Sequence, residues 1–271
     1  MKIKFVVRGF FLALTATVIV AAVGLWVIVG QTPVGRPLDA TPPSPTILAP
    51  HGALPTGDVA FEEWVRHRDE PPVLAGSGFF IRLATGEADE IVAVMTAHSV
   101  GLGNPRRPVE SIELRVAGQE NPVAEMDRLY GHPGQARTGG DMTVDYLLLY
   151  PDQPIASEFV LTPDSRGAPQ PGERVALFSG LGDGQGGCRM LEGTVQSVSD
   201  HAVWVLMDDW FNPGLMSGSP LVSQHTGQVV GMAVAVTPRR TRLLIGVHPI
   251  DSLVQRAESA TEGFEMGEYQ R

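Results

Sequence analysis

The chain has 271 residues, of which 43% are hydrophobic, so it is long enough to bury a core. Its 31 glycines and 22 prolines argue against a helical bundle, because both residue types interrupt helices. The formal net charge of −10 is the opposite of a nucleic-acid-binding surface. The single cysteine, Cys188, excludes an internal disulfide, so packing and hydrogen bonds must stabilise the fold.

The N-terminal segment has the pattern of a membrane anchor. Lys2, Lys4 and Arg8 precede residues 9–30, which carry no charged side chain. A helix of that length spans the hydrocarbon layer of about 30 Å. The alternative is a cleavable signal peptide, whose apolar core is usually shorter, about 7–15 residues. Because positive charges favour the cytoplasmic side, we expect residues 1–8 in the cytoplasm and the rest of the chain in the periplasm or outside the cell.

The anchor is followed by a proline-rich segment, residues 31–57. It lacks a sustained apolar period, so we interpret it as an extended linker, with an irregular part of the domain as the alternative. A folded domain is expected over residues 58–260. The acidic residues 261–271 then form a tail that we expect to be frayed.

The body of the chain predicts an all-β fold. Short apolar segments alternate with Gly, Pro, Asn and Asp, which is typical of barrels or a sandwich. The expected strands are residues 78–83, 91–95, 111–116, 146–150, 174–178, 193–198, 202–207, 228–236 and 242–247. One C-terminal helix is expected over residues 252–257, with Asp251 as its N-cap and Leu253 and Val254 facing inward.

A candidate nucleophile lies in the stretch Asn-Pro-Gly-Leu-Met-Ser-Gly-Ser-Pro-Leu-Val, where Ser217 precedes a glycine. Acyl transfer by a serine needs a base to accept its proton and an acid to orient that base. Of the histidines, only His98 directly follows an apolar strand-like run. Asp145 begins the apolar segment Asp-Tyr-Leu-Leu-Leu-Tyr, and Asp141 is the competing acid. The order Ser, acid, His is excluded for Ser217, whereas the order His, Asp, Ser is available.

Several motifs resemble the trypsin-like peptidase family, most closely its disulfide-free bacterial members. Thr-Ala-His-Ser at residues 96–99 is similar to the family's histidine segment, and Asp-Tyr-Leu-Leu-Leu from Asp145 to its acid segment. Ser-Gly-Ser-Pro-Leu from Ser217 is similar to the nucleophile segment. Gly-Ser-Gly-Phe-Phe-Ile at residues 76–81 and the strand at 227–236 match flanking elements. The similarity covers residues 73–258, and the motifs occur in the family's order.

The resemblance implies two antiparallel six-stranded β-barrels, the first at about residues 73–150 and the second at about 165–250. It implies His98 as general base, Asp145 as the acid that orients it, and Ser217 as nucleophile. The N–H groups of Leu215 and Ser217 would form the oxyanion hole. The family usually has glycine two residues before the nucleophile; here Leu215 occupies that position, so either Leu215 adopts positive φ or the loop shifts to use Gly214.

The same comparison places a substrate pocket at Phe211, Val234 and Val236, which predicts an uncharged, small or apolar residue before the cut. We expect a protein or peptide substrate and no metal or other cofactor, because no His-Glu-x-x-His motif and no cysteine cluster occur. A catalytically weak or inactive peptidase that binds peptides is the alternative function, and an esterase is a third. The sequence leaves the oligomeric state open.

Overall fold

The computed structural model describes residues 48, 52–85, 88–182, 187–260 and 262–269, all within the unit Asp39–Arg271. The expected anchor at residues 9–30 and most of the linker at 31–57 lie outside the described residues. In the described part of the chain, no helix is long and apolar enough to span a membrane. Gly52, near the end of the linker, donates its N–H to the His225 carbonyl at 3.1 Å, so this end of the segment contacts the folded domain.

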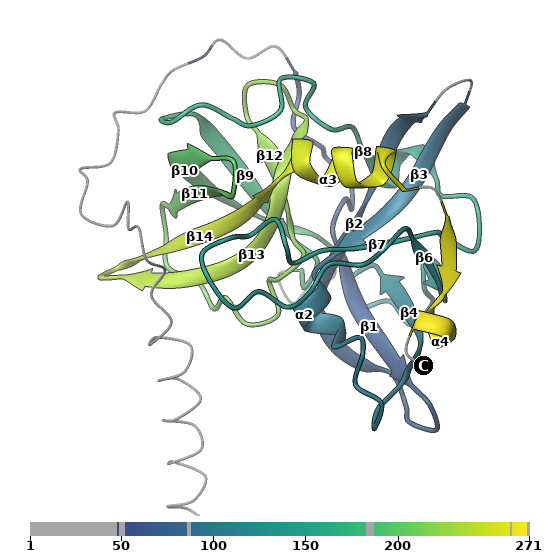
Figure 1. Cartoon of the computed structure of the whole chain (residues 1–271). Coiled ribbons are helices and arrows are strands. Elements are labelled where there is room, and N and C mark those ends of the chain that lie inside the picture. Colours follow the sequence, from purple (N-terminus) through teal and green to yellow (C-terminus); the bar gives the residue numbers. More distant parts are fainter. Residues whose placement is uncertain (1–47, 49–51, 86–87, 183–186, 261, 270–271) are drawn as a thin grey trace, which may run out of the picture. The chain divides into compact units, whose positions relative to one another are not determined.

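One part of the unit is a curved, mainly antiparallel sheet of nine strands, drawn in blue and teal in Figure 1 except for the C-terminal strand, which is yellow. Its strands are β1 (Phe61–His67), β2 (Val73–Thr85), β3 (Ala88–Met95), β4 (Val109–Arg115), β5 (Ala124–Met126), β6 (Arg128–Tyr130), β7 (Leu147–Leu149), β8 (Val160–Leu161) and β15 (Gly263–Glu265). Their order is β15-β6-β7-β3-β2-β1-β4-β5, and β8 pairs with β2 in parallel.

This sheet is a half-barrel, so the expectation of a closed six-stranded first barrel is wrong. β5 pairs with β4 and β6 pairs with β7, yet the two strands are separated only by Asp127. The chain therefore bends between the two ends of the sheet without a ladder of hydrogen bonds closing it. Buried side chains from Phe61, Phe80, Ile112, Leu114 and Leu147 fill its interior.

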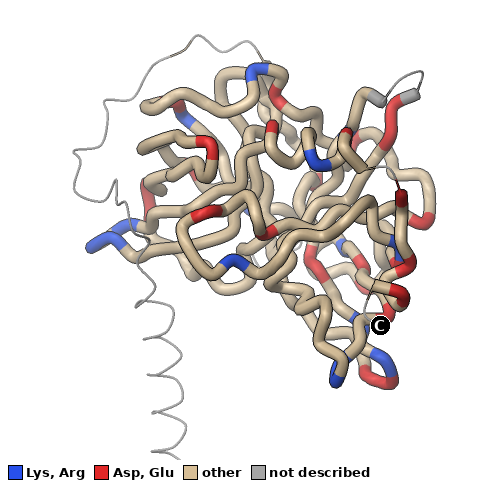
Figure 2. Tube along the Cα trace, in the orientation of Figure 1, with Lys and Arg blue, Asp and Glu red and all other residues tan. Residues whose placement is uncertain are grey.

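The second half is a closed antiparallel barrel, as expected. Its order is β10-β11-β14-β13-β12-β9. The strands are β9 (Arg174–Ser179), β10 (Arg189–Ser199), β11 (Ala202–Met207), β12 (Pro220–Ser223), β13 (Val229–Arg239) and β14 (Arg242–Pro249). A separate core fills it, with Leu177, Val205, Leu221, Val230 and Ile245 among its members. Figure 2 shows basic residues at the tip of the β13–β14 hairpin, which carries Arg239, Arg240 and Arg242.

Every strand expected from the sequence is present, most with shifted ends, but the sequence did not predict β1, which is central to the half-barrel. Its inward side chains alternate with outward ones, in the pattern expected of a strand. Glu63 and His67 occupy inward positions beside Phe61 and Val65, so the apolar alternation is broken. His67 accordingly lies in a strand, where Nδ1 is 3.1 Å from the Arg107 carbonyl oxygen.

The helices are few and short: α2 (Ala97–Val100), α3 (Ile250–Glu258), α4 (Met266–Tyr269) and the 3-10 turn Ser157–Phe159. The C-terminal helix α3 begins two residues earlier than expected, so Asp251 lies in its first turn and Pro249 is the N-cap. Leu253 is fully buried as predicted, and Val254 is half-buried. Because α3 packs on β13, β14 and β2, it connects the two barrels (Figure 1).

The C-terminal tail is ordered rather than frayed over residues 263–269. β15 pairs with β6, and Met266 is fully buried in the half-barrel core. Met266 also donates its N–H to the Asp127 carbonyl at 2.8 Å, at the point where the sheet is open. The tail therefore completes the edge that β6 would otherwise expose.

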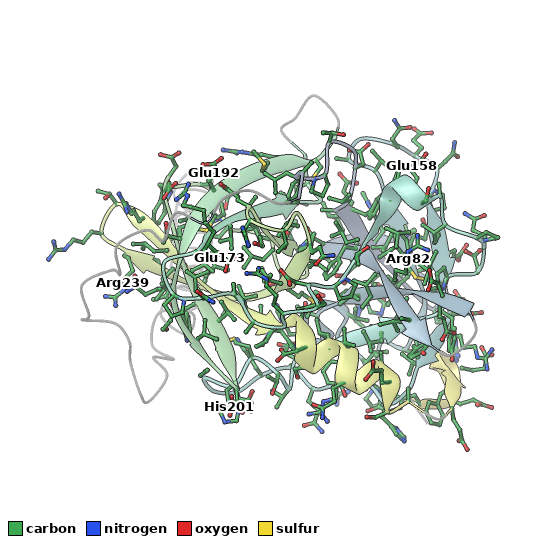
Figure 3. All side chains as sticks on the ribbon, turned by 90° about the horizontal axis from the view of Figure 1, so that it is seen from above. Arg82, Glu158, Glu173, Glu192, His201 and Arg239 are labelled. Atoms are coloured by element: carbon green, nitrogen blue, oxygen red, sulfur yellow. The ribbon has the colours of Figure 1, made fainter. Side chains whose placement is uncertain are left out.

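A charged network stabilises the start of the closed barrel. Arg166 donates to Asp164 at 2.7 Å and to Glu173 at 2.9 Å, and both carboxylates are almost fully buried. Figure 3 shows Glu173 among the strands, whereas Glu192, His201 and Arg239 project outward. Burial raises the pKa of Asp164 and Glu173, but the Arg166 hydrogen bonds outweigh it, so both pKa values lie below their usual range.

Candidate active site

The three residues singled out in the sequence come from separate elements. His98 lies in α2, the single turn that follows β3, and Asp145 lies just before β7. Both belong to the half-barrel. Ser217 lies in the turn before β12 of the closed barrel. The site therefore lies where the two barrels meet, near α2 in Figure 1.

The structure brings these three side chains into one hydrogen-bonded series. His98 Nε2 is 2.9 Å from Ser217 Oγ, and His98 Nδ1 is 2.8 Å from Asp145 Oδ2. The backbone N–H of His98 donates to Asp145 Oδ1 at 3.1 Å, so the carboxylate binds the residue at two points. With Nδ1–H donating to the carboxylate, Nε2 is the acceptor that faces the hydroxyl. This arrangement allows proton transfer from a serine to an imidazole.

Asp145 is held as a carboxylate. Its side chain is fully buried, and burial alone raises the pKa of a carboxyl group. The hydrogen bond and charge of His98, with N–H donors from Arg137 and His98, outweigh burial, so the pKa of Asp145 lies below its usual value. The Arg137 N–H donates to Oδ2 at 3.1 Å. The imidazole is thus oriented by a carboxylate whose ionised form is favoured.

The competing acid, Asp141, forms its contacts with Thr143 and His201. Its Oδ1 accepts from the Thr143 N–H at 2.9 Å and from the Thr143 hydroxyl at 2.7 Å. Its other oxygen is 3.4 Å from His201 Nδ1. Asp141 therefore stabilises its own turn, and Asp145 is the acid that reaches His98.

The turn around Ser217 has two residues with positive φ. Gly218 has φ +90°, and a Cβ added there would lie 1.7 Å from the Ser77 carbonyl oxygen, so only glycine fits. Leu215 has φ +63°, a conformation that costs a side-chain-bearing residue about 1–2 kcal/mol. Of the two arrangements left open by the sequence, the loop takes the one with Leu215 in positive φ.

Strand β2 supports this turn, which the sequence did not reveal. The Ser77 N–H donates to the Ser217 carbonyl at 2.8 Å, and the Ser77 hydroxyl donates to the Leu215 carbonyl at 3.2 Å. Both carbonyls of the turn are therefore bound to β2. Among the described residues, neither Leu215 N–H nor Ser217 N–H donates a hydrogen bond. Two such donors can stabilise an oxyanion.

The expected substrate-pocket residues lie on the closed barrel. Phe211 is 5% exposed and belongs to the barrel core, together with Met216. Val234 is 4% exposed at a β-bulge of β13, and Val236 is half-buried. Phe211 therefore packs inward, and Val236 is the more accessible of the three.

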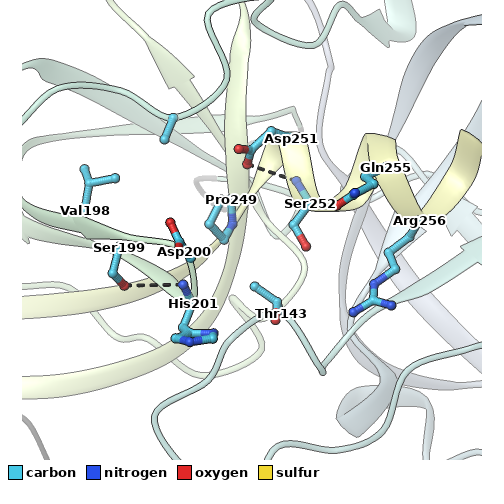
Figure 4. A pocket seen from close by; sticks show the side chains of 11 residues that line it. Thr143, Val198, Ser199, Asp200, His201, Pro249, Asp251, Ser252, Gln255 and Arg256 are labelled. Atoms are coloured by element: carbon cyan, nitrogen blue, oxygen red, sulfur yellow. Dashed lines mark hydrogen bonds between the residues drawn. The ribbon is translucent and has the colours of Figure 1, made fainter.

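A separate pocket is lined by neither Asp145 nor Ser217. It has a volume of about 640 Å³, is open to solvent, and is lined by Thr143, the β10–β11 turn with His201, and α3 with Ser252 and Arg256 (Figure 4). Ser252 Oγ is 3.2 Å from Nε2 of the fully buried His248. Burial lowers the pKa of His248 to about 4, so this imidazole is neutral at physiological pH.

A sequence comparison with protein families matches residues 76–232, more than half of the chain, to the trypsin-like peptidase domain. The chain belongs to the trypsin-like peptidase family. In this trypsin-like peptidase, the matched segment contains His98, Asp145 and Ser217. A search of curated proteins found no match.

Comparison with solved structures found similar serine proteases. A thermostable serine protease, AL20, from an extremophilic microorganism aligns with a TM-score of 0.52 at 11% identity, over 76% of this chain and 97% of that one. The serine endoprotease from Yersinia pestis aligns with a TM-score of 0.49 at 15% identity, over 76% of this chain and 65% of that one. The first alignment shows that the trypsin-like peptidase has the fold of that protease.

The single cysteine, Cys188, is not part of the candidate active site. Burial, together with the nearby Asp58 charge, raises the pKa of the Cys188 thiol to about 12, so little thiolate forms at neutral pH. The Cys188 N–H donates to Asp58 at 3.0 Å. A thiol nucleophile is therefore not supported by the structure at this position.

Proposed function

We propose that the chain is a serine endopeptidase with Ser217 as nucleophile, His98 as general base and Asp145 as the residue that orients His98. The observation that supports it most directly is the continuous series of hydrogen bonds, 2.9 Å from Ser217 to His98 and 2.8 Å from His98 to Asp145. Ser217 is half-buried and His98 is partly exposed, so a substrate can reach both side chains.

In the proposed mechanism, Ser217 Oγ attacks the carbonyl carbon of the peptide bond while its proton moves to His98 Nε2. Asp145 stabilises the imidazolium, and the N–H groups of Leu215 and Ser217 stabilise the oxyanion. His98 then gives the proton to the departing amine as the C–N bond breaks. A water molecule, deprotonated by His98, hydrolyses the acyl-enzyme and restores the serine.

The test is the substitution Ser217→Ala in the full chain, with Ser219→Ala as the matched control. Ser219 lies two residues further on, and its buried hydroxyl has no hydrogen-bond partner in the described part of the chain. We expect Ser217→Ala to lower peptide cleavage by roughly 10⁴-fold or more and to abolish fluorophosphonate labelling, since the nucleophile is lost. We expect Ser219→Ala to retain both.

Cleavage that survives Ser217→Ala would contradict the assignment. One observation favours a second candidate function, a peptide-binding protein with weak or no catalysis: Leu215 occupies a positive-φ position at the oxyanion loop. Loss of one oxyanion donor commonly lowers the rate by about 10²–10³. Peptide binding by the unmodified protein without cleavage or labelling would favour this second function.

We also propose that residues 9–30 anchor the peptidase domain in a membrane and place it outside the cytoplasm. The support is the uncharged run itself and the basic residues Lys2, Lys4 and Arg8 before it. The substrate pocket is proposed at Phe211, Val234 and Val236, with preference for an uncharged side chain before the cut. The assignment of Ser217, His98 and Asp145 does not depend on the proposed anchor or on the proposed substrate pocket.

A further inference from the structure

A second carboxyl group lies beneath the proposed triad. Glu63 is on β1, between β2 and β4, and its side chain is fully buried. A buried carboxylate is costly unless a positive group or several donors accompany it. Within the described residues, no cation forms an ion pair with Glu63, and its only side-chain partner is the Ser99 hydroxyl, at 2.9 and 3.0 Å.

The hydrogen bonds around the Ser99 hydroxyl are all satisfied only when Glu63 carries a proton. Ser99 Oγ lies 2.9 Å from the Thr96 carbonyl oxygen and 2.9 Å from the Thr96 hydroxyl, besides Glu63. A hydroxyl has one proton to donate and two acceptor positions. If Glu63 is the neutral acid, it donates to Ser99, the Thr96 hydroxyl also donates to Ser99, and Ser99 donates to the Thr96 carbonyl. If Glu63 is ionised, Ser99 must donate to it, and the Thr96 carbonyl loses that bond.

This cluster lies directly against the catalytic turn. Thr96 and Ser99 flank His98 in the chain, and Ser99 is in α2 with it. Gly76 pairs with Glu63 across the β1–β2 ladder. A Cβ at Gly76 would lie 2.9 Å from Glu63 Oε2, 3.0 Å from the Ser217 carbonyl oxygen and 3.2 Å from Ser99 Cβ. The carboxyl group therefore fills the space between β1, α2 and the Ser217 turn.

We propose that Glu63 is a positioning residue: as a neutral carboxylic acid hydrogen-bonded to Ser99, it fixes the α2 turn so that His98 lies between Asp145 and Ser217. The inference rests on the proposed catalytic function. Glu63 acts through Ser99 and α2 and does not contact the reacting atoms.

The charges around Glu63 act in the same direction. Burial, opposed by the Ser99 hydrogen bond and reinforced by the charge of Asp145, raises the pKa of Glu63 to about 8. On β4 the residue opposite Glu63 is Leu114, and the neighbouring charged residues Glu113 and Arg115 are on the other face of the sheet. On β2 the facing residues are uncharged, and on α2 the titratable residue is His98, which is bonded to Asp145.

The pH dependence follows from this pKa. In the unfolded chain a glutamate has its ordinary pKa of 4.5, whereas the pKa of folded Glu63 is about 8, so the folded protein keeps this proton to a higher pH. Unfolding therefore releases a proton between these values, and stability falls as pH rises from 4.5 to 8. Above pH 8 the folded protein carries a new negative charge beside Asp145, and Ser99 must turn away from Thr96.

The test compares Glu63→Gln with the unmodified full chain. Glutamine resembles the neutral acid in shape but has no proton to lose. We expect the melting temperature of Glu63→Gln, relative to the unmodified protein, to increase from pH 5 to about pH 8 and then to level off towards pH 9. The matched control is Glu62→Gln, the neighbouring residue on the other face of β1, whose carboxylate accepts from Trp64 Nε1 at 2.8 Å. For Glu62→Gln we expect the melting-temperature difference from the unmodified protein to lack this increase with pH.

The second measurement is the pH profile of kcat/KM for a peptide substrate. At pH 9 roughly a tenth of a group with pKa about 8 keeps its proton, so we expect kcat/KM of the unmodified protein to fall about tenfold from its plateau. Glu63→Gln should keep its plateau at pH 9, and Glu62→Gln should decline like the unmodified protein. Ser99→Ala, which removes the hydrogen-bond partner, should lower kcat more than it changes KM.

Two results would overturn the inference. One is a melting-temperature difference for Glu63→Gln that is the same at pH 5 and pH 9, since it would mean that Glu63 is already ionised. The other is an alkaline decline of kcat/KM that Glu63→Gln shares with the unmodified protein. If neither the unmodified protein nor any variant cleaves peptide, the proposed function fails. The melting temperatures still decide whether Glu63 is a neutral acid that connects β1 to α2 through its hydrogen bond to Ser99.

Discussion

At the scale of single residues, the turn that presents Ser217 depends on two backbone conformations that most side chains avoid. Gly218 is adapted to its position, because φ is +90° and Ser77 leaves no room for a Cβ. Leu215 is not adapted, and its φ of +63° is maintained by the hydrogen bond from Ser77 to its carbonyl. Strain of this kind persists where the surrounding structure over-determines it, often at active sites.

We predict that Gly218→Ala lowers the proposed peptidase activity by about 10²-fold, although the change adds only one methyl group. The new Cβ would lie 1.7 Å from the Ser77 carbonyl oxygen, so the turn must move by an ångström or more. A displacement of that size can lower the rate by about 10²-fold. The measurement is kcat/KM on a peptide substrate. Gly214→Ala is the control, because its nearest atom would be Asn212 Oδ1 at 3.3 Å; equal losses in both variants would contradict the explanation.

The residue scale also shows how much of the site could be predicted from the sequence. The sequence predicts His98, Asp145 and Ser217, because each lies in a short recognisable motif beside an apolar segment. It does not predict Ser77, Glu63 or Ser99, since their contacts are made across the fold. Ser77 meets Leu215 at a separation of 138 residues, and Glu63 meets Ser99 at a separation of 36. No local pattern signals such contacts.

At the scale of secondary-structure elements, the strands that escaped prediction are short or carry polar residues on the buried face. β1 was missed because Glu63 and His67 interrupt its apolar alternation. β5, β6 and β15 have three residues each, too few for a period to be recognised. β15 and α4 lie in a segment whose acidic composition indicated a frayed tail, yet pairing with β6 and burial of Met266 order it.

We predict that Met266→Ala destabilises the protein although the residue lies near the C-terminus. Met266 is fully buried in the half-barrel core, so its truncation should lower the free energy of unfolding by about 2–5 kcal/mol. The measurement is equilibrium denaturation. Met190→Ala is the control, because Met190 is 44% exposed and should change stability little. A frayed tail would instead give two variants of equal stability.

At the scale of the whole molecule, the site exists because two sheets with separate cores meet. The half-barrel supplies His98 and Asp145, and the closed barrel supplies Ser217. α3 packs on strands of both, and the Ser77 bonds join β2 directly to the Ser217 turn. Any change that separates the barrels should therefore affect catalysis before it unfolds either core.

The proposed anchor yields a prediction at the same scale. We expect the full chain to remain in the membrane fraction after an alkaline carbonate wash. The double substitution Val18→Arg and Ala22→Arg should release it, because each charge near the centre of a spanning helix costs about 2.5–3.5 kcal/mol. Val34→Arg in the proline-rich linker is the control and should stay bound. A full chain that is washed off would contradict the anchor, and a chain shortened by cleavage would indicate a signal peptide.

The sequence by itself determined the all-β class, the order of most strands and the identity of the three candidate catalytic residues, because these depend on local periodicity and on motifs a few residues long. Only the tertiary structure decided the rest. It gave Leu215 rather than Gly214 the strained position, left the first sheet open at Asp127, and placed Glu63 against Ser99. Each of these outcomes depends on distances between segments that are remote in the chain, which folding sets and local sequence does not encode.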